Sequence, residues 1–229
     1  MEAPSVLAAA RSASTELAQL FEKIREVPSF GADNGLALKL LLALCVREGE
    51  LLGARWEEFD LDGNTPLGAV WHVPASRTKT GAPLDIPLVP AVVAWLHEIK
   101  TLDASSEYLF PKRRRDRRER VPHVGLDTLN AALQRVQHGL PPFTLHDLRR
   151  TARTQLAALG VRREVAERCL GHAIRGVEGI YDRHSYFKER RAALEQWTSL
   201  LIEVERGSST IISIHRAPQA RSSGQVRVT

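Results

Sequence analysis

Apolar residues recur with a helical period over most of the chain. The segment at 35–46, GLALKLLLALCV, is apolar on all sides, which is typical of a helix at the centre of a core, and Asp33 or Asn34 can serve as its N-cap. Further helices are predicted at 15–26, 50–54, 90–100, 126–136 and 187–203. The chain should therefore be mainly helical.

One part of the sequence follows a period of two instead. WHVP (71–74) and LDIPL (84–88) are predicted to be short strands, and the loop between them, ASRTKTGAP, contains Gly81 for the turn. Lys79 therefore lies in or beside a hairpin connection. The predicted fold class is α+β, mainly α: a helical domain with a small antiparallel β-hairpin or sheet.

Polar side chains with reactive chemistry concentrate between residues 143 and 181. Thr144 and Asp147 form a capping-box pattern, which predicts that a helix begins at the residue after Thr144. Gly160 can end this helix, and a second helix is expected to end before Gly171.

The spacing within this stretch assigns faces to its side chains. His146 and Arg149 are three residues apart, so they share one face of the first helix. His172 follows directly after the second helix, and Tyr181 comes nine residues later. The face predicted to be buried consists of Leu148, Ala152, Leu156 and Leu159.

Charge and cysteine content narrow the environment. The net charge is +5, and residues 112–120, KRRRDRRER, carry seven positive and two negative charges. Such a run fits a polyanionic partner, but basic runs are more often solvated loops than recognition surfaces. Cys45 and Cys169 lie among apolar residues without metal-ligand spacing, which indicates buried free thiols in a reducing compartment. Because no apolar run approaches about 18 residues and no signal peptide is evident, we expect a soluble cytoplasmic protein with no membrane partner.

The 229 residues suit one ordinary domain with small additions. Residues 1–30 are expected to form a short lead-in without a core of its own, and residues 31–205 a single domain. Residues 206–229 are rich in Ser, Gly and Arg, as in a mobile tail, although TIISI at 210–214 can add as a strand to a sheet edge.

Seven polar residues occur in apolar surroundings or at the ends of predicted elements: Arg47, Glu50, Lys79, His146, Arg149, His172 and Tyr181. Together they suit the attack of a tyrosine oxygen on a phosphodiester. Two arginines and donor histidines can bind the oxygens of the doubly charged transition state, so we expect no metal and no other cofactor. A histidine near the tyrosine can accept its proton, and a lysine can protonate the leaving oxygen.

These residues stand in motifs that resemble those of the tyrosine recombinases, or phage integrases. The motifs are, in the family's order, RxxE at 47–50, ARWEEFDLD at 54–62, TKTG at 78–81, HDLRRT at 146–151, LGH at 170–172, and Tyr181. Each is weak alone, but their order and spacing over residues 35–200 form a specific signal. The ARWEEFDLD segment and GIYDRHSYFKERRAALEQW (179–197) are most similar to integrases of prophages and genomic islands.

The resemblance implies how the phosphate is bound. Arg47 and Arg149 would contact the scissile phosphate, and His172 would be a third donor. Glu50 would orient Arg47.

The resemblance also implies the roles of the reacting groups. Tyr181 would be the nucleophile that forms a 3′-phosphotyrosyl DNA intermediate, His146 the general base or a phosphate ligand, and Lys79 the acid for the leaving group. The partner would be double-stranded DNA, bound by a homo-oligomer, a tetramer in this family, with no small-molecule substrate.

Simpler interpretations exist for single residues. His146 can cap its helix, His172 can be an ordinary core histidine, and Arg47 with Glu50 can be a structural ion pair. Tyr186 is a rival nucleophile, five residues after Tyr181.

Three further arginines are candidates for contacts with the DNA backbone: Arg77, Arg150 and Arg153. Arg77 is also an alternative to Lys79 as the acid.

Two other functions remain open at this stage. Integrases normally carry an arm-binding and a core-binding domain before the catalytic segment, and only about 30 residues precede it here. We therefore expect a catalytic fragment or a truncated relative, and a non-catalytic DNA-binding or assembly module is the main alternative. A type IB topoisomerase shares the chemistry and is the third possibility.

Overall fold

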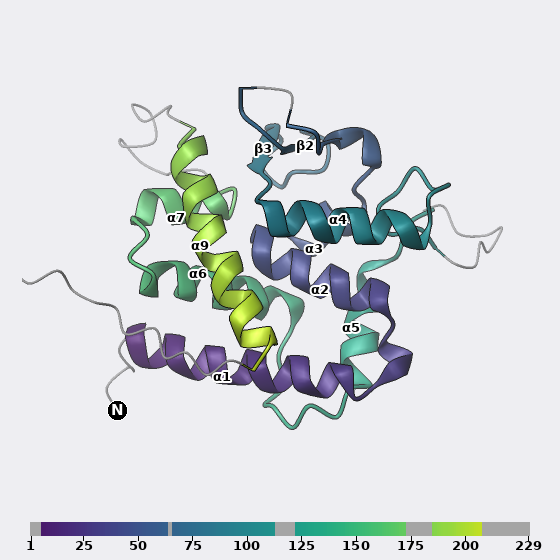
Figure 1. Cartoon of the computed structure of the whole chain (residues 1–229), viewed down its shortest axis with the longest axis vertical. Coiled ribbons are helices and arrows are strands. Elements are labelled where there is room, and N and C mark those ends of the chain that lie inside the picture. The colour runs from purple at the N-terminus through teal and green to yellow at the C-terminus, as the bar shows by residue number, and fades with distance from the viewer. Residues whose placement is uncertain (1–5, 64–65, 113–121, 173–184, 208–229) are drawn as a thin grey trace, which may run out of the picture.

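Helix α2 (Ala32–Leu44) runs through the middle of the molecule, and the other elements pack around it (Figure 1). This computed structural model describes residues 6–63, 66–112, 122–172 and 185–207. Within α2, Leu38, Leu40 and Leu42 are completely buried, which confirms the prediction of a central core helix. Its neighbours are α3 (Glu48–Leu52), α4 (Pro90–Leu102), α6 (Leu145–Ala158) and α9 (Phe187–Glu205).

The described residues contain further helical elements. They are α1 (Val6–Arg25), the 3₁₀ helices η1 (Pro28–Phe30) and η2 (Trp56–Glu58), α5 (Leu126–Gln134) and α7 (Arg163–Cys169).

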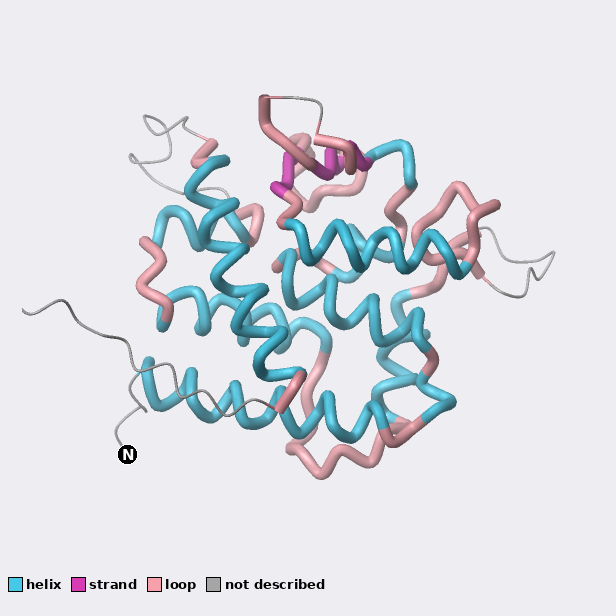
Figure 2. Tube along the Cα trace, in the orientation of Figure 1, coloured by secondary structure: helices cyan, strands magenta, loops and turns pink. Residues whose placement is uncertain are grey.

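The strands form one small antiparallel sheet at an edge of the molecule (Figure 2). Its order is β1 (Phe59–Asp60), β2 (Val70–Val73) and β3 (Leu84–Pro87). Trp71 pairs with Ile86 across β2 and β3, and both side chains are fully buried. The two predicted strands and the predicted fold class, α+β and mainly α, are confirmed. Strand β1 was not predicted, because two residues are too few to display a period of two.

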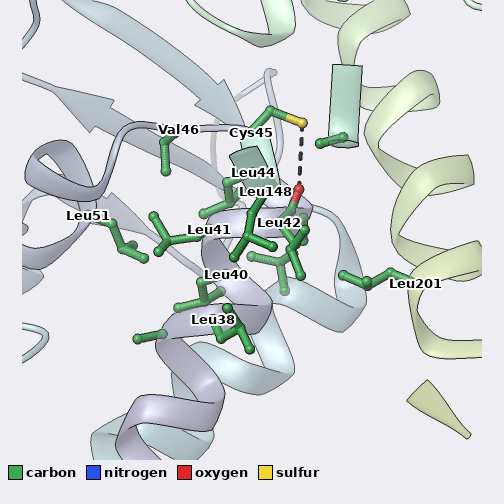
Figure 3. Close-up of a cluster of buried hydrophobic side chains, with 14 of the residues drawn as sticks. Leu38, Leu40, Leu41, Leu42, Leu44, Cys45, Val46, Leu51, Leu148 and Leu201 are labelled. Carbon is green, nitrogen blue, oxygen red and sulfur yellow. Dashed lines mark hydrogen bonds between the residues drawn. The ribbon is translucent and has the colours of Figure 1, made fainter. Parts of the chain in front are cut away.

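Buried side chains from several helices meet at the C-terminal half of α2. Figure 3 shows Leu148 of α6 and Leu201 of α9 converging on Leu42 and its neighbours. The indole Nε1 of Trp197 donates to the carbonyl of Leu42 at 2.7 Å, so α9 is tied to α2 by a hydrogen bond as well as by packing. Each fully buried leucine of this kind stabilises the fold by about 1.5–3 kcal/mol.

Helix α1 packs against α6 and α9 as part of the same unit. Leu17, Leu20 and Phe21 are at most 4 % exposed and belong to the common core. The helix begins at Val6, whereas the prediction began at residue 15. The Ala-rich segment that precedes residue 15 has a high helix propensity, so it extends the helix toward the N-terminus. The division of the chain at residue 30 stays a prediction.

The start of α2 corrects another expectation. Gly31 is the N-cap, so the prediction that Asp33 or Asn34 caps this helix is wrong. Asp33 lies in the first turn instead, where a negative charge is favourable beside the helix dipole. The amide of Asn34 reaches back to the carbonyl of Phe30 at 2.5 Å.

Several predicted features lie outside the described residues: Tyr181, most of the basic run at 112–120, and the segment at 210–214. Within the part of the chain that the structure describes, no helix is long and apolar enough to cross a membrane. Cys45 and Cys169 are buried free thiols, as predicted.

Candidate active site

The capping box at the start of α6 fixes the first turn of that helix. The backbone N–H of Thr144 donates to Oδ2 of Asp147 at 2.9 Å, and the N–H of Asp147 donates back to Oγ1 of Thr144 at 3.4 Å. The hydroxyl of Thr144 also donates to Oδ2 at 2.7 Å, and these hydrogen bonds hold the pKa of Asp147 below its usual value. The prediction that a capping box begins this helix is confirmed, and His146 and Arg149 both stand in its first turns.

Arg149 is buried and hydrogen-bonded to the backbone of two other elements. Its guanidinium donates to the carbonyls of Cys45, after α2, and of Leu170, after α7. Cys45 ends α2 in the left-handed conformation, with φ at 56°. Only 5 % of Arg149 is exposed, and burial, followed by the charge of Arg47, lowers its pKa to about 10. Arg149 therefore remains a cation at neutral pH, and it is held in one orientation.

Arg47 and Glu50 form a second capping arrangement at the start of α3. The backbone N–H of Arg47 donates to Oε2 of Glu50 at 2.9 Å, and Nη1 of Arg47 lies 2.9 Å from Oε1. The Glu50 side chain is 3 % exposed, whereas that of Arg47 is 27 % exposed. Glu50 thus uses both oxygens to orient an arginine whose outer face stays open to solvent.

The β2–β3 connection is attached to α3 through Arg77. Nη1 of Arg77 donates to the carbonyl of Glu50 at 2.7 Å, and its Nη2 forms an ion pair with Glu58. Glu58 also accepts a hydrogen bond from Trp71 Nε1 at 2.9 Å. Arg77 therefore links the loop that carries Lys79 to the segment that carries Arg47.

A cleft of about 340 Å³ lies between these elements. It brings together four of the residues predicted to be catalytic, namely Arg47, Lys79, His146 and Arg149, although they come from distant parts of the chain. Lys79 and His146 are exposed, so their polar ends are accessible to a ligand in the cleft. Glu48, Glu50, Arg77 and Thr78 complete the polar lining.

Glu48 is an acidic group that the sequence did not single out. Burial and the nearby charge of Asp127 raise its pKa, while His146 and a hydrogen bond with Asn130 act in the opposite direction. Its Oε2 is buried without a hydrogen-bond partner among the described residues. Because it borders the cleft, its charge opposes that of the surrounding arginines.

His172 adjoins this arrangement through Arg149. Its Nε2 lies 3.2 Å from Nη2 of Arg149, and its Nδ1 lies 2.6 Å from Oε2 of Glu167. Glu167 was not predicted to belong to the site. The available signal was Gly171, whose positive φ of 61° ends α7 and turns the chain so that His172 comes back beside Glu167.

The other candidates are placed as follows. Tyr181 lies outside the described residues, while its rival Tyr186 is the N-cap of α9, packed against the core with Arg162 over its ring at 5.7 Å. Arg150 is 74 % exposed beside Asp147, and Arg153 donates to Glu167 at 2.8 Å. In the described ranges, no group of three His, Cys, Asp or Glu side chains is placed to hold a metal ion.

Comparison with known proteins gives a consistent family. The model of the Phage integrase family matches residues 11–188. The prophage integrase IntA of Escherichia coli (strain K12) is 28 % identical over 202 residues, which cover 88 % of this chain and 46 % of IntA. The prophage integrase IntZ of the same strain is 27 % identical over 81 % of this chain and 46 % of IntZ.

A phage protein gives the same result. The integrase of Enterobacteria phage P4 is 27 % identical over 75 % of this chain and 40 % of its own length. The chain thus spans less than half the length of these relatives. No solved structure matches it.

Proposed function

The chain belongs to the phage integrase family. From that premise we propose that it acts as the catalytic domain of a site-specific DNA recombinase. Such a domain cleaves and rejoins DNA through a 3′-phosphotyrosyl intermediate. The observation that carries the proposal is the cleft lined by Arg47, Lys79, His146 and Arg149. Packing of α3, α6 and the β2–β3 connection assembles this set from three separate segments. A phosphodiester needs these donor types for metal-free cleavage.

Arg47 and Arg149 bind the scissile phosphate. Each guanidinium is already oriented, by Glu50 in one case and by two backbone carbonyls in the other. The two positive charges oppose each other, since the charge of Arg47 contributes to the lowered pKa of Arg149. A phosphate between them adds negative charge that both guanidinium groups attract, and the fixed forks match its oxygens.

The reaction is a transesterification in which each bond broken is matched by one formed. Oη of Tyr181 attacks phosphorus while His146 takes the phenolic proton. The bond from phosphorus to the 5′ oxygen breaks, and Nζ of Lys79 gives a proton to that oxygen. The phosphotyrosyl ester conserves the energy of the bond, so a 5′-hydroxyl of another strand can reverse the step without ATP.

The DNA partner is double-stranded, and the negative charge of its phosphate backbone is attracted by the arginines in and around the cleft. Arg150, with 74 % of its side chain exposed, is the strongest candidate for an additional phosphate contact, followed by Arg153 and Arg77. Strand exchange joins two duplexes, and we propose that a homo-tetramer of the integrase performs it on DNA. Binding should weaken steeply as the salt concentration rises, because the protein releases counterions from the DNA when it binds, and this release is less favourable at high salt.

The arrangement favours catalysis over a non-catalytic DNA-binding module. Such a module needs exposed positive charge, but it does not need a buried arginine held by two carbonyls beside a second oriented arginine. A type IB topoisomerase would use the same chemistry, and the integrase relatives favour the recombinase.

Capture of the covalent intermediate tests the proposal. The full chain is incubated with a pool of nicked duplexes of randomised sequence, and protein–DNA adducts that survive denaturant are isolated and sequenced. We expect the wild-type chain to form an adduct on a defined sequence, and Tyr181→Phe to form none.

Tyr186→Phe is the matched control, since it removes the same hydroxyl at the rival position and should leave the adduct in place. Adduct formation by Tyr181→Phe would overturn the assignment of the nucleophile. A wild-type chain that forms no adduct with any member of the pool would count against the catalytic function itself.

A further inference from the structure

The C-terminal end of α7 holds His172 through the backbone. Gly171 adopts φ of 61°, the N–H of His172 donates to the carbonyl of Glu167 at 3.0 Å, and the N–H of Gly171 donates to the carbonyl of Arg168 at 3.1 Å. This pair of hydrogen bonds is a Schellman motif, which ends a helix in a fixed geometry. The main chain therefore places the imidazole next to the side chain of Glu167.

The carboxylate of Glu167 lies between two donors. Its Oε2 is 2.6 Å from Nδ1 of His172, and its Oε1 accepts from Nε of Arg153 at 2.8 Å. Burial acts to raise the pKa of Glu167, but the hydrogen bonds from His172 and Arg153 outweigh it and leave that pKa below the usual value. Glu167 is thus ionised at neutral pH and acts as an acceptor at both oxygens.

An ionised carboxylate at Nδ1 determines where the imidazole proton sits. Nδ1 must carry the proton to donate to Glu167, so Nε2 of the neutral ring has a lone pair. That lone pair faces Nη2 of Arg149 at 3.2 Å, where it can accept a hydrogen bond. To donate to the proposed phosphate, Nε2 must carry a proton as well, so the ring that acts in catalysis is the doubly protonated one, held by the same contact at Nδ1.

Both supporting arginines come from one helix. Arg149 and Arg153 are four residues apart on α6, which puts them on the same face, one turn apart. One contacts Nε2 of His172, and the other contacts the carboxylate that holds Nδ1. The four side chains thus form a continuous chain of contacts between α6 and the end of α7.

We propose that Glu167 is a positioning residue for His172: it fixes the protonation of Nδ1 and directs Nε2 toward the phosphate. Its catalytic part rests on the proposed function, because His172 matters as a phosphate donor only if the chain cleaves DNA. The tautomer itself does not depend on activity. A contact that only ties α7 to α6 would contribute stability without controlling the proton.

Nitrogen NMR of the full chain, labelled at histidine nitrogens, measures that proton directly. Glu167→Gln keeps the shape of the side chain. Its amide has only one acceptor oxygen for two donors, His172 and Arg153, so its NH₂ group must face one of them. In the wild-type chain we expect the Nδ1 resonance of His172 at the protonated position. In Glu167→Gln it should shift toward the unprotonated position, and His172→Asn identifies the resonance by its loss.

Two controls separate positioning from a structural tie. Glu164→Gln is the same change at an exposed site on the same helix and should leave the resonance unchanged. Arg153→Leu removes the tie to α6 while leaving Glu167 beside His172, so it should lower the unfolding temperature but keep the Nδ1 proton. An unchanged resonance in folded Glu167→Gln, or a shift in Arg153→Leu alone, would overturn the proposal.

Adduct formation provides the catalytic readout. Glu167→Gln should slow it by at least about tenfold, because one correctly placed donor to the charge of the transition state contributes about 10²–10³-fold. A wild-type chain that forms adduct alongside an equally fast Glu167→Gln would refute the positioning role in catalysis. A wild-type chain without adduct would refute the proposed function, and the NMR result would still decide whether Glu167 controls the tautomer.

Discussion

The sequence predicted the contacts of some residues in and beside the cleft but not those of others. The pairing of Arg47 with Glu50 follows from their spacing at the start of a helix, and the structure contains it. The sequence also put Arg149 on a face with His146, but it gave no sign that backbone carbonyls would bury and hold the guanidinium. Every residue has a backbone carbonyl, so the identity of a residue does not show whether its carbonyl binds a side chain. Glu167 escaped prediction for a related reason: only the turn at Gly171 brings His172 back to it.

Gly171 is therefore a residue where a small change should have a local effect. An added Cβ would lie 2.9 Å from Cδ2 of Leu84, and the positive φ of 61° disfavours any side chain. We expect Gly171→Ala to lower the free energy of unfolding by about 1–2 kcal/mol, measured by urea unfolding.

Gly160→Ala is the matched control, since Gly160 has φ of 79° and open space around its Cα. It should cost less than Gly171→Ala, and it should not alter the NMR signal of His172. An equal loss at both positions would show that the contact with Leu84 contributes nothing.

At the scale of elements, the sequence predicted best those features that depend on residues only a few positions apart. The start of α6 was predictable because Thr144 and Asp147 are three residues apart and form a recognised cap. The tie between the β2–β3 connection and α3 was not, since Arg77 binds Glu58 and a carbonyl of a different element. Sequence predicted the hairpin, but only the fold showed how Lys79 is kept beside the cleft.

The cap of α6 should make part of the stability depend on pH. The pKa of Asp147 is lowered in the folded state, first by its hydrogen bonds with Thr144. Its contribution is then fully present above the unfolded carboxyl pKa of about 3.9 and is lost as the pH falls through the lowered folded value. Asp147→Asn should cost about 0.5 kcal/mol near pH 7, a figure reduced for the 41 % exposure of this side chain.

Urea unfolding of both chains over a pH series measures this difference, which should vanish at acid pH. In a Thr144→Ala background, Asp147→Asn should cost less, because the partner is already missing. A difference that stays constant with pH would contradict an ionised cap.

At the scale of the whole molecule, periodicity predicted the helices but not their arrangement. The pattern of 35–46 correctly indicated a central helix, and the fold class followed from the helical periods along the chain together with the hairpin. Which helices would surround it depends on contacts between residues far apart in sequence, such as Trp197 with the carbonyl of Leu42. The same limit applies to the cleft, whose members were recognised by motif and brought together only by the fold.

Helix α1 offers a test of how far this unit extends. Leu20 is fully buried in the common core, so Leu20→Ala should lower the free energy of unfolding by about 2–5 kcal/mol. Because α1 packs on α6 and α9, circular dichroism and tryptophan fluorescence should report one shared transition.

Glu22→Ala, at an exposed position on the same helix, should change stability by no more than about 0.5 kcal/mol. Separate transitions in Leu20→Ala, with the tryptophan signal unaffected, would indicate that α1 is an appendage to the domain.

The hydrogen bond between Arg149 and the carbonyl of Cys45 joins residues 104 positions apart. During synthesis at about 5–20 residues per second, Arg47 leaves the ribosome roughly 5–20 s before Arg149 does. A nascent chain therefore carries Arg47 well before Arg149 can join it in the proposed phosphate site. Such long-range contacts raise the contact order and slow folding, so the proposed phosphate site should form late, only once the α6 and α7 segments have been made.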